Sequence, residues 1–131
     1  MHMRLVGFSH VNIRCTEREL PAVVNFYREV LGLRNGHRPD FGFAGAWLYC
    51  GEAPLVHISA RYQEGLLVYG EGHRGSVDHV AFEVTDVEGF REHLQRLGIK
   101  FREATVPGTA HQIFVHDPVG TKLELSFRNQ T

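Results

Sequence analysis

The chain contains one strand pattern twice, and this duplication constrains the fold more than any other feature of the sequence. Residues 9–15 read SHVNIRC and residues 78–84 read DHVAFEV, so a histidine stands at the same place in both copies. After each histidine, apolar side chains alternate with other residues, which is the period of a β-strand with one buried face. A chain that repeats a strand in this way is expected to contain two copies of one module.

The likeness between the two halves extends through a helix. Residues 16–34 and residues 85–102 both place apolar side chains at helical spacing. Both stretches reach a Leu-Gly pair, whose glycine can take the left-handed conformation that ends a helix. Thr16 or Thr85 can cap the start of its helix, and Pro21 is tolerated only within a first turn.

A short strand and a hairpin follow each predicted helix. The hairpins span residues 46–59 and residues 112–126, and the second contains HDPVG, the pattern of a type I turn closed by a left-handed glycine. The order β-α-β-β-β therefore occurs twice, and each copy needs a partner layer to cover the apolar face of its sheet. We predict an α+β fold in which two βαβββ modules form a curved, U-shaped mixed sheet with the helices outside.

The two predicted modules together fit one domain of ordinary size in a chain of 131 residues. Module one covers about residues 5–63, a glycine-containing connection covers about residues 64–76, and module two covers about residues 77–128. Two copies are too few for a solenoid, so we expect a single domain, residues 1–131.

Composition excludes several classes of function. An apolar content of 43% and a charged content of 22% are typical of a soluble globular protein. The net charge of −1 provides no basic surface for nucleic acid or for an anionic membrane. No apolar run has the length of a membrane span, and the first ten residues lack the apolar segment of a signal peptide. With two cysteines and no disulfide framework, we expect a cytoplasmic protein with a small-molecule partner and no nucleic-acid or membrane partner.

The repeated histidines lie on the strand face that does not pack under a helix. In the first copy His10, Asn12 and Arg14 share this face, because alternate residues of a strand point the same way. In the second copy His79 lies on the corresponding face. Both histidines are therefore expected to point into the space that the curved sheet encloses.

The last strand of each module adds one polar residue between apolar neighbours. His57 stands in PLVHIS and Glu124 stands in KLELSF. Trp47 lies ten residues before His57, and Phe114 lies ten residues before Glu124, so the two polar residues occupy equivalent places. The two modules together supply four candidate metal ligands at matched positions, which are His10, His57, His79 and Glu124.

The donor types indicate which ions such a site would accept. Imidazole and carboxylate suit a borderline divalent ion, namely zinc, nickel, iron(II), cobalt or manganese. A buried ionised glutamate is costly without a partner, and a cation removes that cost. The alternative is that each of the four residues is a satisfied core side chain, which is the commoner situation for a single strand histidine. Four such residues at matched positions of a repeat favour the metal site.

These residues resemble the vicinal oxygen chelate superfamily, which includes glyoxalase I, methylmalonyl-CoA epimerase, extradiol dioxygenases, fosfomycin-resistance transferases and bleomycin-resistance proteins. The resemblance covers almost the whole chain and rests on SHVNI, FYREVLGL, LVHIS, DHVAFEV, HDPVGTKLEL and the doubled βαβββ order. It implies a metal at the bottom of a U-shaped cleft and a homodimer, in which some members share ligands between subunits. It also makes the four candidate residues the metal ligands.

Counting ligands favours one reaction class among those that the resemblance implies. Four protein ligands leave two adjacent places on an octahedral ion, enough for two vicinal oxygens of a substrate and none for O₂. This favours enolisation by a glyoxalase-like lyase or isomerase, in which Glu124 and His57 are the candidate proton-moving residues. The alternative is an extradiol-type iron(II) dioxygenase, in which His57 stands off the metal. A third is a bleomycin-resistance-type protein that binds a ligand without catalysis.

The resemblance also suggests residues that hold the substrate. Glyoxalase I binds the carboxylate of glutathione with an arginine that Arg14 matches, whereas Arg61 replaces an expected asparagine and His57 replaces an expected glutamate. These departures leave open glutathione or another thiol as a cosubstrate. The two arginines could bind an anionic substrate or could be solvated charges. The other candidate substrate-binding residues are Asn12, Trp47, Gln112 and Phe114, with His111 as a group that could reach the cleft. The two aromatic rings among them could instead be core packing.

Overall fold

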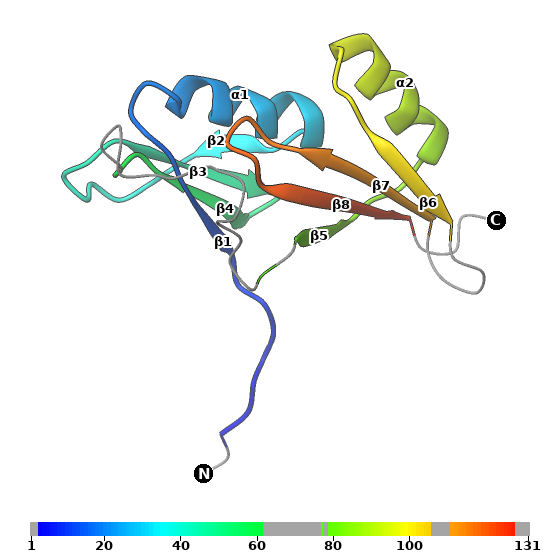
Figure 1. Ribbon diagram of the computed structural model, residues 1–131. Coiled ribbons are helices and arrows are strands. Elements are labelled where there is room, and N and C mark those ends of the chain that lie inside the picture. The colour runs from blue at the N-terminus through cyan, green and yellow to red at the C-terminus, as the bar shows by residue number, and fades with distance from the viewer. Residues whose placement is uncertain (1–2, 62–76, 78, 106–110, 128–131) are drawn as a thin grey trace. The chain divides into compact units, whose positions relative to one another are not determined.

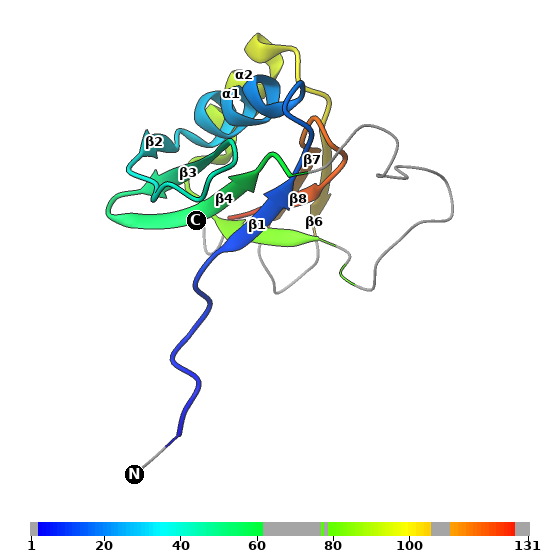
Figure 2. The ribbon, with the colours of Figure 1, turned by 90° about the vertical axis from the view of Figure 1, so that its left-hand side faces the viewer.

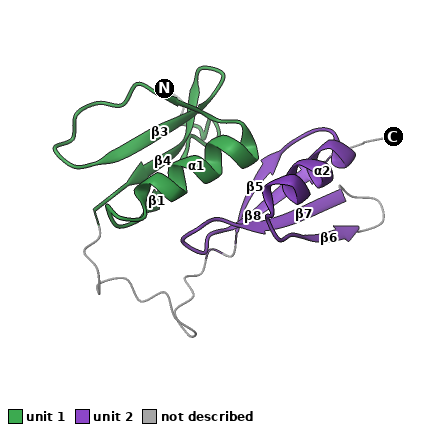
Figure 3. Ribbon diagram, turned by 90° about the horizontal axis from the view of Figure 1, so that it is seen from above, with its two compact units in different colours: residues 1–64 green, residues 65–131 purple. Residues whose placement is uncertain are grey.

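The chain folds into two units with the same order of elements. The computed structural model describes residues 3–61, 77, 79–105 and 111–127. One unit comprises residues 1–64 and the other residues 65–131 (Figure 3). The connection predicted between the modules lies outside the described residues.

The first unit is a four-stranded mixed sheet with one helix on it (Figure 1). The strand order is β1-β4-β3-β2, with β1 parallel to β4 and the remaining neighbours antiparallel. The elements in chain order are β1 (Val11–Arg14), α1 (Leu20–Leu31), β2 (Arg34–Gly36), β3 (Gly45–Cys50) and β4 (Ala53–Ser59).

The second unit has the same topology. Its strand order is β5-β8-β7-β6, with β5 parallel to β8 and the other neighbours antiparallel. The predicted α+β class and the doubled βαβββ order are therefore confirmed, while the joining of the two sheets into one curved sheet stays a prediction. The elements are β5 (Val80–Glu83), α2 (Val87–Leu97), β6 (Arg102–Thr105), β7 (His111–His116) and β8 (Lys122–Phe127).

Both helices end as the sequence predicts. Gly32 and Gly98 follow α1 and α2 with φ angles of 70° and 71°, the left-handed conformation that glycine adopts at no steric cost. Pro21 lies in the first turn of α1, where its missing N–H leaves no hydrogen bond unmade. Among the described residues, neither helix is long and apolar enough to cross a membrane.

The starts of the two helices differ from each other. In the turn before α1, the side chain of Glu19 accepts a hydrogen bond from the backbone N–H of Thr16 at 2.9 Å, and the side chain of Thr16 accepts one from the backbone N–H of Glu19 at 3.2 Å. Thr16 therefore caps this turn, while the N-cap of α1 itself is Glu19. The start of α2 is capped by Asp86, whose carboxylate accepts a hydrogen bond of 3.0 Å from the backbone N–H of Gly89. The predicted cap at Thr85 is therefore wrong, because the neighbouring aspartate provides the stronger acceptor.

One face of each sheet is buried under its helix, and in the first unit α1 covers that face (Figure 2). The buried residues of α1 recur at helical spacing, so they form one apolar stripe against the sheet. Full burial of such a side chain contributes about 1.5–3 kcal/mol. In the second unit Phe90 of α2 contacts Phe127 of β8, with ring centroids 5.7 Å apart. The fully or nearly fully buried residues of the first unit include Val23, Phe26, Tyr27, Val30, Leu48, Val56 and Ile58.

Candidate functional site

The face of the first sheet that α1 leaves open carries a row of polar and aromatic side chains across its strands. Asn12 of β1 pairs with His57 of β4, and His57 pairs with Trp47 of β3. Their strand neighbours Ile13 and Ile58 point the opposite way and are buried. The predicted alternation is confirmed, and Trp47 lies beside His57 as the repeat predicts.

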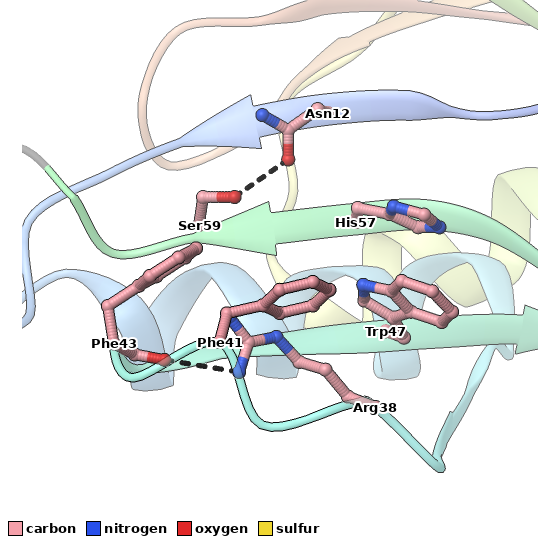
Figure 4. A pocket seen from close by; sticks show the side chains of 7 residues that line it. All are labelled: Asn12, Arg38, Phe41, Phe43, Trp47, His57 and Ser59. Carbon is pink, nitrogen blue, oxygen red and sulfur yellow. Dashed lines mark hydrogen bonds between the residues drawn. The ribbon is translucent and has the colours of Figure 1, made fainter.

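His57 lies between two other rings. Its ring centroid is 3.8 Å from that of His10, with the planes 13° apart, and 4.0 Å from that of Trp47, with the planes 12° apart. Figure 4 shows the stacked rings of His57 and Trp47. Within the part of the chain that the structure describes, Nε2 of His57 is buried without a hydrogen-bond partner. Buried polar nitrogens normally have a partner, so this atom is the clearest candidate for a ligand contact in the first unit.

The surroundings of His57 favour its neutral form. Burial lowers the pKa of the imidazole below its ordinary value of 6.5, and the nearby His10 and Arg38 lower it further. A hydrogen bond to the backbone of Pro54 acts in the opposite direction and raises the pKa, but by less. Desolvation disfavours a charged imidazole, and positive neighbours repel it. A neutral imidazole keeps a lone pair on one ring nitrogen, and this neutral form is the one that binds a metal ion.

The second unit places a histidine and a carboxylate together at the equivalent positions. Nε2 of His79 lies 3.4 Å from Oε1 of Glu124, and Gln112 donates a hydrogen bond of 3.1 Å to the same oxygen. Glu124 is only 9% exposed. It pairs with Ala81 of β5 and Phe114 of β7, just as His57 pairs with Asn12 and Trp47.

The β7–β8 turn sets this register. Gly120 has a φ of 89°, and Oδ1 of the buried Asp117 accepts hydrogen bonds from the backbone N–H groups of Val119 and Thr121, at 3.0 and 2.8 Å. The HDPVG turn is thus confirmed, with an aspartate that holds it closed. The turn sets Phe114 opposite Glu124, and Gln112 and the exposed His116 are the other β7 residues on this face.

Phe114 lies among positive and imidazole groups. The guanidinium carbon of Arg102 is 4.9 Å and Nζ of Lys122 is 5.0 Å from the ring centroid. The ring of His79 meets it edge-on at 6.1 Å. Phe114 is half-buried on the face that carries Glu124, so it does not belong to the core under α2.

The four predicted ligands therefore occur as two pairs, one in each unit. Both pairs consist of the residue before the first strand and a residue of the last strand, and the last-strand residues match in register. Among the described residues, no three side chains of His, Cys, Asp or Glu gather in the way that a metal ion requires. The donors of each pair fit a borderline divalent ion, and no hydrogen bond among the described residues occupies the buried Nε2 of His57. The convergence of the two pairs on one ion stays a prediction.

A pocket of about 110 Å³ lies on the same open face of the first unit (Figure 4). Its position beside the candidate ligand His57 makes it a candidate substrate-binding site. Four of its residues did not emerge from the sequence analysis, namely Ser59 and three residues of the RPDFGF stretch before β3, a sequence that is not repeated in the second module. The residues that line it are Asn12, Arg38, Phe41, Phe43, Trp47, His57 and Ser59.

The two arginines predicted to bind an anion have different surroundings. Arg14 is exposed at the end of β1, on the same strand face as Asn12. Arg61 is exposed with its guanidinium carbon 4.7 Å from the ring centroid of Phe43, at the edge of the pocket. The carboxylate-binding role of both residues stays a prediction.

His111 does not lie on the candidate metal face. Its Nε2 is 2.8 Å from Oε2 of Glu103, and its Nδ1 is 2.9 Å from Oγ1 of Thr105. Glu103 also bonds Arg91 of α2 at 2.6 and 2.9 Å, and these bonds lower the pKa of its carboxyl. The suggestion that His111 reaches the cleft is wrong, because residues of β7 alternate in direction and Gln112 takes that face.

Comparison with known proteins agrees with this fold. The model of the family described as Glyoxalase/Bleomycin resistance protein/Dioxygenase superfamily matches residues 7–125. A search of the curated proteins found no match.

Solved structures similar to this chain come from several bacteria. One from Bacillus anthracis, named as a glyoxalase family protein, is 22% identical to this chain and has a TM-score of 0.75. The matched part covers 98% of this chain and 100% of that protein. The fosfomycin resistance protein FosX from Listeria monocytogenes is 17% identical, with 97% of each chain covered and a TM-score of 0.70. Lactoylglutathione lyase from Agrobacterium tumefaciens is 16% identical, with 95% of each chain covered and a TM-score of 0.65. At these identities the likeness shows a shared fold.

Proposed function

The chain belongs to the Glyoxalase/Bleomycin resistance protein/Dioxygenase superfamily, and from this premise we propose that it is a metal-dependent, glyoxalase-like lyase or isomerase. Its substrate would be a small molecule with two neighbouring oxygens. We expect it to act as a homodimer in the cytoplasm, with glutathione or another thiol as a candidate cosubstrate. The observation that carries the proposal is the buried Nε2 of His57, which lacks a hydrogen-bond partner among the described residues.

The proposed ligands are His10 and His57 from the first unit and His79 and Glu124 from the second. Their donors suit zinc, nickel, iron(II), cobalt or manganese. A divalent ion held there would act as a Lewis acid that polarises a substrate carbonyl.

Glu124 is the residue best placed to move a proton. Its carboxylate is buried, and Gln112 and His79 hold Oε1, so its orientation is fixed on the open face of the sheet. A positioned carboxylate with restricted motion is suited to carry a proton between adjacent carbons of a bound substrate. His57, whose neutral form is favoured, would serve as a ligand more readily than as a base.

A first test combines metal content with assays of activity. Elemental analysis of the purified protein should find close to one divalent ion per chain, and turnover should be sought with hemithioacetals and other α-hydroxycarbonyl substrates. His79→Ala and Glu124→Gln should lose the ion and reduce turnover at least about 100-fold, as expected when a general acid–base group is removed. The exposed His116 at the end of β7 gives a control, because His116→Ala should leave both unchanged. A metal-free protein, or variants with full metal and activity, would refute the proposal.

A specific observation also favours the iron(II) dioxygenase as the second candidate. The rings of His10 and His57 are nearly parallel and 3.8 Å apart, so the nitrogen lone pairs of the two rings lie in separate planes. Both rings can bind one ion only if at least one rotates. If His57 keeps its stacked position, His10, His79 and Glu124 would form a two-histidine, one-carboxylate set. Bound iron with O₂ uptake on catechols would favour this candidate over the lyase.

A pocket without any bound ion would point to the third alternative, a ligand-binding protein of the bleomycin-resistance kind. The metal analysis decides between this alternative and both enzymes, because a sequestering protein needs no ion.

A further inference from the structure

We propose that the pocket of the first unit binds a flat, ring-like part of the substrate that carries a carboxylate, and that Arg38 is the residue that recognises this carboxylate. The inference rests on the proposed function in one respect, which is that the pocket beside His57 belongs to the substrate site. The substrate class is an aromatic or similarly planar carboxylate, and Arg38 is the residue that would select it.

The pocket is built from a row of rings. Trp47 stacks on His57 on one side, and its ring centroid lies 6.2 Å from that of Phe41 on the other. Phe41 in turn stacks on Phe43 with centroids 5.8 Å apart. Figure 4 shows these rings along one side of the pocket. Aromatic faces and edges attract other flat groups, so this row favours a planar ligand over a chain-like one.

Arg38 is fixed in place against these rings. Its guanidinium carbon lies 4.9 Å from the ring centroid of Phe41 and 5.0 Å from that of Phe43, and its Nη1 donates a hydrogen bond of 3.1 Å to the carbonyl oxygen of Phe43. Cation–π contacts of this kind hold a guanidinium in one orientation. The cation is therefore preorganised at the pocket wall.

Gly45 makes this arrangement possible. A Cβ atom added at Gly45 would lie 2.7 Å from Nη2 of Arg38 and would also collide with the carbonyl oxygen of Ile58. The guanidinium thus packs directly on the backbone of β3, in space that any other residue would fill.

The charge of Arg38 is available to a ligand. In the described ranges of the chain, no carboxylate forms an ion pair with it; Asp40 instead accepts a hydrogen bond of 2.9 Å from the backbone N–H of Gly42. A guanidinium has five N–H donors, of which the bond to Phe43 uses one. The remaining donors match the two oxygens of a carboxylate. Arg61, whose guanidinium carbon lies 4.7 Å from the ring centroid of Phe43, adds a second positive charge.

The size of the pocket suits one ring. Its volume of about 110 Å³ is somewhat below the roughly 150 Å³ of an engineered cavity that binds benzene. The pocket is open to solvent, so the rest of a substrate could extend from it toward His57.

The rival explanation is that Arg38 only pins the loop before β3 through its bond to Phe43. The two explanations differ in what they predict for ligands. A structural arginine gives no preference for an anionic ligand, whereas an anion-binding arginine does.

The test uses the single tryptophan of the chain, Trp47, as a reporter inside the pocket. Tryptophan fluorescence of the full-length protein is titrated with benzoate, with the neutral isostere benzamide and with acetate, first as purified and then after treatment with EDTA. Benzoate should change the emission with an affinity at least about tenfold higher than that of benzamide, and acetate should have little effect. Equal affinities for benzoate and benzamide would overturn the proposal, as would acetate binding as well as benzoate.

Two variants assign the preference to Arg38. Arg38→Gln should abolish the preference for benzoate over benzamide, while Arg38→Lys should keep only part of it because lysine cannot pair with both oxygens. Arg34→Gln is the matched control, since Arg34 also lies on a ring, that of Tyr49, and also bonds a backbone carbonyl, but does not line the pocket. An undiminished preference in Arg38→Gln would refute the assignment. The wild-type comparison stands even if a variant fails to fold.

The EDTA arm separates this proposal from the proposed function. If the preference for benzoate survives removal of metal, the pocket acts as proposed even in a protein that later proves inactive as a lyase. If the preference disappears with the metal and is insensitive to Arg38, the carboxylate binds the ion, and the metal proposal holds while this one fails.

Discussion

His57 acquires its properties from the residues around it. The ring lies between His10 and Trp47, and its Nε2 has no hydrogen-bond partner within the described residues. The sequence predicted that His57 and Trp47 would be neighbours, because the repeat matches them to Glu124 and Phe114. It did not predict the stacking or Arg38, because ring orientation and loop conformation depend on contacts between elements that periodicity does not describe.

The lowered pKa of His57 predicts a pH dependence of stability in the metal-free protein. The folded-state pKa lies below the unfolded value of 6.5, so unfolded chains bind more protons as the pH falls through this range. The free energy of unfolding should therefore fall as the pH drops below about 6.5 and recover above it. Urea unfolding between pH 5 and pH 7.5 measures this slope, which His57→Gln should reduce. An unchanged slope in that variant would show that other histidines cause the effect.

At the scale of elements, comparing the two copies of the repeat predicted the positions of the helices and strands better than the residues of either copy alone could. Both helices, both short strands and both hairpins occur where the doubled pattern places them, and Gly32, Gly98 and Gly120 take the left-handed conformations expected of them. The error was at the start of α2, where Thr85 and Asp86 both have side chains suited to a cap. Asp86, the residue that caps α2, has a φ of 73°. Whether Thr85 or Asp86 takes this conformation depends on the path of the backbone after β5.

Capping by Asp86 gives a test at this scale. Asp86→Ala removes the acceptor for the N–H of Gly89 and should lower the free energy of unfolding by about 1 kcal/mol. Thr85→Ala is the matched control and should change it by less than about 0.5 kcal/mol. Chemical denaturation of both variants measures the difference, and equal losses would argue against the cap at Asp86.

At the scale of the whole molecule, duplication puts equivalent chemistry on two sheets. Each unit has an open face with an imidazole before its first strand and a second donor at a matched position of its last strand. The sequence predicted these pairs because strand alternation and the repeat together fix which residues share a face. The pocket beside His57 breaks the symmetry, since the RPDFGF sequence before β3 is not repeated before β7, and comparison of the two copies could not find it.

The central claim is that the two pairs act together on one ion. The most direct measurement is a titration of the metal-free protein with Co²⁺, followed by visible absorption, on the wild type and on His10→Ala, His57→Ala, His79→Ala and Glu124→Ala, with His116→Ala as the control. We predict one ion per chain in the wild type and in the control, and an affinity reduced more than about tenfold by a change in either unit, because loss of a ligand should cost at least as much as loss of a residue that only orients a ligand. If both changes in one unit left the affinity intact, or if the wild type bound no ion, the claim of a shared metal site would be contradicted.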